Sequence, residues 1–210
     1  MQCRAQGISK RFNRNQVLDR IDLEIDPGDR IAILGSNGSG KSTLLRILAG
    51  QLAPSKGKLS YSIQDSEIDT DKVYRHLTLV GPYTDVYRQF TFSELVDFHF
   101  SLRELRSDLD RADVLKAIDV PLKRPLRSFS SGMLQRVKLV LAFATQAEIV
   151  LLDEPTMNLD DAGVAWFENQ IAGLPDDVTL VIASNEPERE TRSCTTRYRL
   201  DSGTLRPEHK

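Results

Sequence analysis

Apolar residues along the chain gather in short runs of strand length that are separated by turn residues. The stretch 17–25 alternates, with Ile21, Leu23 and Ile25 on one face, and this alternation predicts a half-buried strand. Four other short apolar runs predict strands, at 30–34, 77–80, 149–152 and 178–183, and the runs at 149–152 and 178–183 are typical of buried strands. Helices are predicted at 42–49 and 162–171, because a glycine at position 50 or 173 ends each apolar pattern.

The middle of the chain has a helical pattern. Thr91 and Glu94 form a capping box that opens a helix to about residue 102, and 110–118 predicts a second helix. Ser130 is suited to cap a third helix, which carries one apolar stripe. Strands that alternate with helices outside this region predict an α/β fold with a mainly parallel sheet. We expect a single domain over 1–210, with a core at about 1–84 and 147–210 and a helical subdomain at about 85–146.

A glycine-rich segment between the strand at 30–34 and the following helix matches the pattern GxxxxGK[ST] in full. Glycines let backbone N–H groups turn inward around an anion, and the helix N-terminus faces the same charge. Lys41 is expected to bridge the β- and γ-phosphates of a nucleotide, and the Ser42 hydroxyl to bind Mg²⁺. The predicted nucleotide-binding residues here are Gly35, Ser36, Asn37, Gly38, Ser39, Gly40, Lys41, Ser42 and Thr43.

Two carboxylates follow the buried run at 149–152. A buried strand brings Asp153 to its carboxyl end, where ligands bind in such sheets, so Asp153 is expected to hold Mg²⁺ directly or through water. Glu154 is expected to polarise the water that attacks the γ-phosphate. A core strand followed by a polar turn is the alternative interpretation, and the phosphate loop upstream makes it the less favoured one.

Segment 129–136, which reads FSSGMLQR, lies between these two motifs and opens a helix. It resembles the signature of ABC ATPases, LSGGQ followed by xQR, with Ser130 and Gly132 matching and other positions substituted. Segment 157–160, MNLD, resembles the D-loop of the same family. The chain is therefore similar to an ABC cassette over nearly its whole length.

This resemblance implies a P-loop NTPase fold with a RecA-like core, an N-terminal antiparallel β part and an inserted helical subdomain. It also implies a head-to-tail dimer of cassettes, which we expect to be a homodimer, enclosing two ATP molecules with Mg²⁺. Phe12 has the position of an aromatic residue that stacks on adenine, with an ordinary edge aromatic as the alternative. The residues implied to contact the ATP held by the partner are Ser130, Ser131, Gly132 and Asp160.

Two landmarks of the family are replaced in this chain. Pro82 falls where the family has a glutamine that contacts Mg²⁺ and the attacking water. Asn185 falls where the family has a switch histidine. The histidines of this chain lie at other positions, namely His76, His99 and His209. Because asparagine can donate a hydrogen bond but cannot carry charge, we expect Asn185 to act beside Lys41 and Glu154 in slow hydrolysis.

The composition of the chain limits the classes of partner and the compartment that can be expected for it. Of 210 residues, 40% are hydrophobic, which is enough for a core, and the net charge of −2 leaves no basic excess for binding nucleic acid. No apolar run approaches the ~18 residues that span a bilayer. Cys3 and Cys194 are the only cysteines, so a reducing compartment is expected.

The leading hypothesis is an ATP-binding and ATP-hydrolysing subunit of an ABC transporter. Its membrane-spanning subunits would be separate chains, and the cassette would lie peripherally at the cytoplasmic face of the cell membrane. The alternatives are a soluble ABC ATPase acting on a ribosome or other soluble partner, and a nucleotide-binding module without turnover. A GTPase or small-molecule kinase is least favoured, because it leaves segment 129–136 unexplained.

Overall fold

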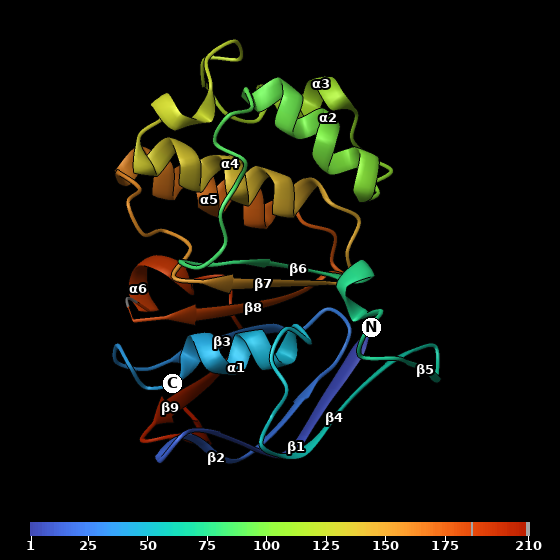
Figure 1. Cartoon of the computed structure of the whole chain (residues 1–210), viewed down its shortest axis with the longest axis vertical. Coiled ribbons are helices and arrows are strands. Elements are labelled where there is room, and N and C mark those ends of the chain that lie inside the picture. The colour runs from blue at the N-terminus through green and yellow to red at the C-terminus, as the bar shows by residue number, and fades with distance from the viewer. Residues whose placement is uncertain (186, 209–210) are drawn as a thin grey trace.

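In the computed structural model, the strands form two sheets that face each other across one helix (Figure 1). The structure describes residues 1–185 and 187–208, so His209 lies outside the described residues. An antiparallel sheet has the order β2 (Asn15–Ile25), β1 (Gln2–Phe12), β4 (Lys56–Ile63), β5 (Ser66–Ile68). The other sheet has the order β10 (Thr204–Pro207), β9 (Thr196–Asp201), β3 (Arg30–Leu34), β8 (Thr179–Ser184), β7 (Ile149–Asp153), β6 (Leu77–Val80).

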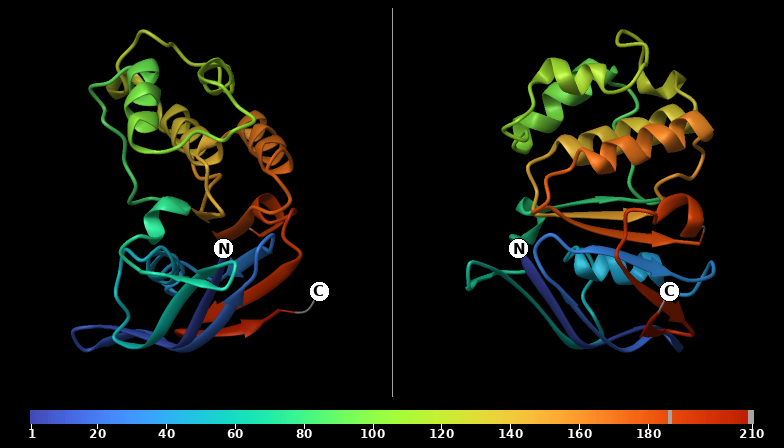
Figure 2. Two further views of the ribbon diagram at one scale, coloured as in Figure 1. Left: turned by 90° about the vertical axis from the view of Figure 1, so that its right-hand side faces the viewer. Right: turned by 180° about the vertical axis from the view of Figure 1, so that it is seen from behind.

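Five neighbouring strands of this second sheet, β9 to β6, run parallel, and only β10 pairs antiparallel. The helices are α1 (Lys41–Leu48), α2 (Phe92–Leu102), α3 (Arg111–Lys116), α4 (Ser131–Ala144), α5 (Asp161–Ala172) and α6 (Pro187–Glu190), with 3-10 turns η1 (Val73–Arg75) and η2 (Leu126–Ser128). Helix α1 lies between the two sheets, while α4 and α5 cover the opposite face of the parallel strands (Figures 1 and 2). The mainly parallel sheet and the antiparallel part agree with the predicted fold class.

Alternating side chains of the parallel strands enter two different cores. On β3, Ile31 and Ile33 pack with α1 and the antiparallel sheet. Ala32 and Leu34 of the same strand pack with α4 and α5 on the other face. Because both faces are covered, these strands contain apolar residues in succession, as the sequence pattern predicts.

The helical part has a core of its own, in which α2, α3 and α4 share buried side chains. The predicted capping box of α2 is present, since Thr91 accepts a hydrogen bond from the Glu94 N–H and Glu94 bonds back to the Thr91 N–H. The Trp166 indole of α5 donates to the Ala117 carbonyl at 2.7 Å and ties this part to the core. The division into core and subdomain near residues 84 and 146 stays our proposal.

Candidate functional site

The phosphate loop runs from the end of β3 to the start of α1. Gly40 has a φ of +107°, and a Cβ there would lie 2.9 Å from a methyl carbon of Leu18 and 3.1 Å from the Val17 carbonyl oxygen. Only glycine adopts this conformation so close to β2 without strain. The N-cap residue of α1 is Gly40, which has no side chain to cap the helix, so the first N–H groups of α1 are left for an anion.

Lys41 is a fixed cation inside this loop, with 4% of its surface exposed. Its ammonium donates to the carbonyl oxygens of Gly35 at 2.8 Å and Ser36 at 3.2 Å. The same nitrogen lies 3.6 Å from a carboxylate oxygen of Glu154. The structure therefore brings the phosphate loop and the second predicted motif into direct contact.

Two hollows adjoin at this point. One, of about 320 Å³, is lined by the loop from Asn37 to Thr43 together with Glu154. The other, of about 310 Å³, includes Asp153, and both are lined by Ser42 and Tyr83. We call the two hollows together the recess, which extends from the phosphate loop to Asp153 at the carboxyl end of β7, where ligands bind in parallel sheets.

Asp153 has the environment expected of a metal ligand. Burial raises the pKa of this carboxyl above its usual range, while a hydrogen bond with Ser42 works in the opposite direction. Its Oδ1 atom is buried and has no hydrogen-bond partner within the described part of the chain. A buried oxygen of this kind needs a partner, and carboxylate and hydroxyl oxygens are ligands that Mg²⁺ accepts. Asp153 and Ser42 therefore fit the predicted Mg²⁺ site.

Glu154 is held in an unusual backbone conformation, with a φ of +49°. Its N–H donates to the Ala183 carbonyl of β8 at 2.9 Å, and its carbonyl accepts from the Met157 N–H at 3.1 Å. A side chain in this left-handed region is strained and persists where neighbouring contacts determine it. Those contacts place the Glu154 carboxylate at the recess, as its predicted role requires.

Asn185 follows β8 and lies beside the phosphate loop. Its side-chain amide donates to the side-chain Oδ1 of Asn37 at 3.0 Å. The end of β8 is thus close enough to the loop for Asn185 to reach a bound phosphate. Its role in hydrolysis stays a prediction.

The segment that resembles the signature starts α4 in the helical part. Ser130 caps the helix by accepting a hydrogen bond from the Met133 N–H at 3.2 Å, as predicted. Ser130 and Ser131 are exposed, and Gly132 follows in the first turn. An exposed helix N-terminus with a serine cap is suited to bind an anion presented by another molecule.

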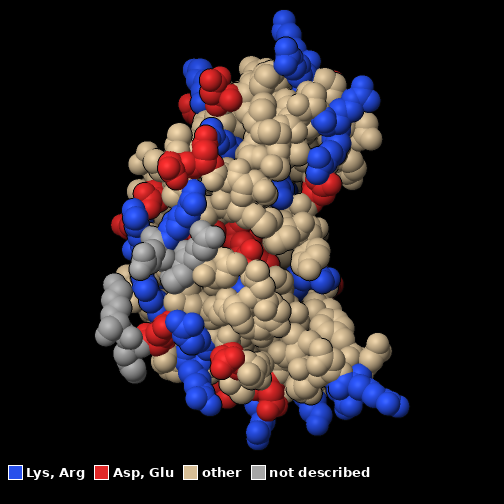
Figure 3. Space-filling view, turned by 90° about the vertical axis from the view of Figure 1, so that its left-hand side faces the viewer, with Lys and Arg blue, Asp and Glu red and all other residues tan. Residues whose placement is uncertain are grey.

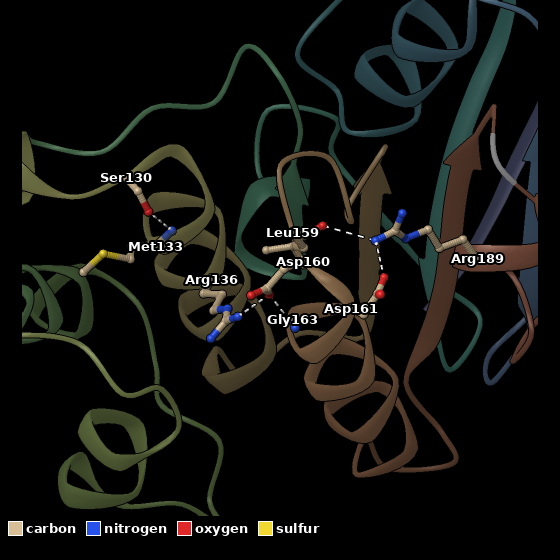
Figure 4. A network of polar contacts seen from close by, with 8 residues as sticks. All are labelled: Ser130, Met133, Arg136, Leu159, Asp160, Asp161, Gly163 and Arg189. Atoms are coloured by element: carbon tan, nitrogen blue, oxygen red, sulfur yellow. Dashed lines mark hydrogen bonds and ion pairs between the residues drawn. The ribbon is translucent and has the colours of Figure 1, made fainter.

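Asp160 is held within its own chain (Figure 4). One carboxylate oxygen accepts hydrogen bonds from the Arg136 guanidinium and from the Gly163 N–H, both at 2.8 Å. A Cβ at Gly163 would lie 3.0 Å from the Arg136 guanidinium, so this glycine leaves room for the ion pair. From the other side, Arg189 donates to the Leu159 carbonyl at 3.2 Å. The loop after Glu154 is thus fastened to both α4 and α6.

Figure 3 views the edge of the molecule at which β6, β7 and β8 end. Acidic side chains lie in the hollow between the helical part and the core, and basic side chains lie toward the margins. A negative recess needs cations to hold a polyphosphate, which agrees with the cationic Lys41 and the expected Mg²⁺.

A sequence model of the ABC transporter family matches residues 18–157, which is more than half of the 210 residues. The chain belongs to the ABC transporter family. The matched region contains the phosphate loop, the signature-like segment and Asp153–Glu154.

Relatives of this cassette are ATP-binding proteins. It is 32% identical to the sulfate/thiosulfate import ATP-binding protein CysA 1 of Agrobacterium fabrum, over 76% of this chain and 49% of that protein. It is 28% identical to the ABC transporter ATP-binding protein YtrB of Bacillus subtilis, over 92% of this chain and 62% of YtrB. It is 32% identical to the zinc import ATP-binding protein ZnuC 2 of Hahella chejuensis, over 86% of this chain and 70% of ZnuC 2. The cassette thus spans about half to seven tenths of the length of these relatives.

Among solved structures, the fold is similar to the ATP-binding cassette MJ0796 in a dimeric post-hydrolysis state bound to ADP and Pi. The TM-score is 0.84 at 22% sequence identity, over 98% of this chain and 97% of that one. This likeness confirms the predicted cassette fold.

Of the remaining residues considered, Phe12 lies outside the recess, whereas Pro82 and Tyr83 line it. Phe12 is exposed at the end of β1, where the Lys10 ammonium lies 5.1 Å from its ring centre, and it does not line the two hollows. Adenine stacking by Phe12 therefore stays a prediction. Pro82 lines the first hollow, and its neighbour Tyr83, 80% exposed, lines both. Tyr83 was not predicted as a site residue from the sequence, although it directly follows the position of the family's glutamine.

Proposed function

We propose that this cassette binds Mg-ATP, hydrolyses it, and drives transport through separate membrane-spanning subunits. The observation that carries the proposal is the meeting of Lys41, Glu154 and the Asp153–Ser42 pair around one recess. Relatives named for sulfate/thiosulfate and zinc import support a role in transport.

The chain's own residues divide the reaction between binding and proton transfer. The N–H groups of the loop and of α1 bind the phosphates, and Lys41 exchanges its carbonyl partners for β- and γ-phosphate oxygens. Asp153 and Ser42 would hold Mg²⁺, which would supply positive charge against the negative charge that develops on the phosphate oxygens. Glu154 accepts a proton from water as the water oxygen bonds to the γ-phosphorus. The bond from that phosphorus to the bridging oxygen breaks, and ADP and phosphate leave.

A second cassette completes the site in this proposal. Ser130, Ser131 and Gly132 would bind the γ-phosphate of the ATP held by the partner, because their helix N-terminus is exposed and capped. Asp160 already binds Arg136 and Gly163 of its own chain, so its part in the partner's site would accompany that internal contact. The dimeric state of the MJ0796 cassette supports a dimer here.

Asn185→Ala should lower the turnover number by about tenfold or more, since one transition-state hydrogen bond to a charged oxygen contributes about 1.5–3 kcal/mol. Asn185→His should leave turnover unchanged or raise it. Phosphate release at saturating ATP measures turnover apart from affinity. Asn169→Ala, on the exposed face of α5, is the control. Native turnover in Asn185→Ala would make Asn185 a bystander.

The proposed membrane partner would dock near 82–89, between core and helical part. No helix within the described residues has both the length and the hydrophobicity to cross a membrane. Exposed Tyr87 packs against Phe90 and Phe98, with ring centres 5.6 and 5.3 Å away, so aromatic surface is present at this place. Such a surface is typical of a protein contact. We propose a peripheral location at the cytoplasmic face of the membrane.

A cysteine introduced by Gln89→Cys should crosslink to a polytopic membrane protein in native membranes. The native thiols should not react with the crosslinker, because burial raises the pKa of Cys3 to about 12 and that of Cys194 to about 11. Glu67→Cys, on the exposed edge strand β5, is the matched control and should give no such product. Recovery of only ribosomal or other soluble proteins from Gln89→Cys would favour a non-transport cassette.

A further inference from the structure

A buried carboxylate, Glu190, lies at the end of α6, outside the residues assigned above. Only 5% of its surface is exposed. Its Oε1 atom accepts two hydrogen bonds from Thr156, one from the backbone N–H at 2.9 Å and one from the hydroxyl at 2.7 Å. Thr156 is itself buried and stands two residues after Glu154.

Glu190 lies in α6, which packs against β8. Ser184 ends β8 and is among the groups that lower the pKa of the Glu190 carboxyl against the effect of burial. Ser184 directly precedes Asn185. Glu190 thus fastens the segment that carries Glu154 to α6, beside the strand end that carries Asn185.

Burying the Glu190 carboxylate is unfavourable for the stability of the fold, so its presence indicates a specific role. Burial raises the pKa of Glu190, although the hydrogen bonds with Ser184 and Thr156 oppose that change. A buried ionisable group lowers stability unless its partners compensate for the lost hydration. An apolar side chain at position 190 would attach the short helix α6 to the core without this loss of stability. We infer that the carboxylate is present because of the hydrogen bonds that it accepts.

The loop beside Glu190 needs anchors because the Glu154 backbone is left-handed. On one side, the Gln135 amide of α4 donates to the Pro155 carbonyl at 2.9 Å. On the other side, Glu190 holds both donors of Thr156. Within the described residues, Glu190 is the acceptor for both the buried N–H and the hydroxyl of Thr156, so its removal would leave these donors unpaired and the segment would rearrange to satisfy them.

We propose that Glu190 is a positioning residue that holds the carboxylate of Glu154 in its hydrolytic place by fastening Thr156 to α6. This inference rests on the proposed function, in which Glu154 accepts the proton of the attacking water. Glu190 does not line either hollow of the recess, and it acts through Thr156. Its loss therefore changes turnover and leaves ATP affinity nearly as it was.

The test measures the turnover number and the dissociation constant for Mg-ATP on the full chain. Glu190→Ala should lower turnover at least about tenfold, with the dissociation constant within about twofold of the native value. Glu190→Gln keeps a carbonyl oxygen for the two Thr156 donors and should recover most of the turnover. Glu168→Gln makes the same chemical change on the surface of α5 and should match the native chain.

A second pair of variants covers the case in which Glu190→Ala does not fold. Thr156→Val removes one of the two donors at nearly constant volume and should lower turnover several-fold, while Thr156→Ser should restore it. Native turnover in a folded Glu190→Ala overturns the inference, and so does native turnover in Thr156→Val when Glu190→Ala is unfolded. If the native chain hydrolyses no faster than Glu154→Gln, the proposed function fails and the inference with it.

Discussion

Replacing Glu154 with glutamine should leave ATP binding intact and lower the rate of hydrolysis by about a hundredfold or more. A positioned general base typically contributes about 10²–10⁴-fold, and glutamine cannot accept the proton of the attacking water. ATP binding should survive, because the phosphates are held by the loop and Lys41. With hydrolysis blocked, the ATP-bound dimer should accumulate, so size exclusion in Mg-ATP should show a larger fraction of dimer for Glu154→Gln than for the native chain.

The surface variant Glu168→Gln provides the control for this experiment, since it removes an exposed carboxylate that pairs with Arg192. It should behave as the native chain in both assays. A Glu154→Gln protein that remains monomeric and hydrolyses ATP at the native rate would contradict the role assigned to Glu154.

Lys41→Ala should weaken ATP binding by about a hundredfold or more. The substitution removes the ammonium that contacts Gly35, Ser36 and Glu154 within the loop. Charge-assisted hydrogen bonds contribute about 1.5–3 kcal/mol each, and Lys41 is expected to make two to the β- and γ-phosphates. Titration calorimetry with Mg-ATP measures the loss directly.

Lys116→Ala, at the exposed end of α3, is a matched control and should bind ATP with native affinity. Circular dichroism should show that Lys41→Ala is folded before its affinity is compared. A folded Lys41→Ala protein with near-native affinity would remove the phosphate loop from the site.

The elements that could be predicted from sequence are those whose burial pattern is regular. The parallel strands β3, β7 and β8 are apolar throughout because they are covered on both faces, and they were placed to within about one residue at most ends. The starts of helices α2 and α4 could be predicted because Thr91 and Ser130 are N-capping residues. The phosphate loop and Asp153–Glu154 follow from their positions at the ends of such strands.

Several strands could not be placed from pattern alone. The pairing of β1 with β2 shifts register between Ala5 and Ile8 and again toward Lys10, so inward and outward positions do not alternate regularly. Strands β4, β9 and β10 contain many exposed residues and lie at or near sheet edges. Their pairing depends on distant parts of the chain, which a local hydrophobic pattern does not record.

The same limit applies to the site. The links from Arg136 to Asp160 and from Glu190 to Thr156 join residues 24 and 34 positions apart, and only tertiary packing brings them together. Arg136 belongs to the xQR part of the signature, which marked the segment without revealing its partner. The burial and the role of Glu190 could not be predicted from the sequence, because a glutamate in a charged stretch is usually a surface residue.

The backbone of Glu154 has a consequence for how this family member can evolve. A residue at φ +49° is tolerated at lowest cost when it is glycine or asparagine, so selection for folding stability alone would replace Glu154. Selection for ATP turnover acts in the opposite direction and retains the carboxylate. In a lineage that kept nucleotide binding but no longer needed turnover, this position would be among the first to drift, and the drift would make the protein more stable.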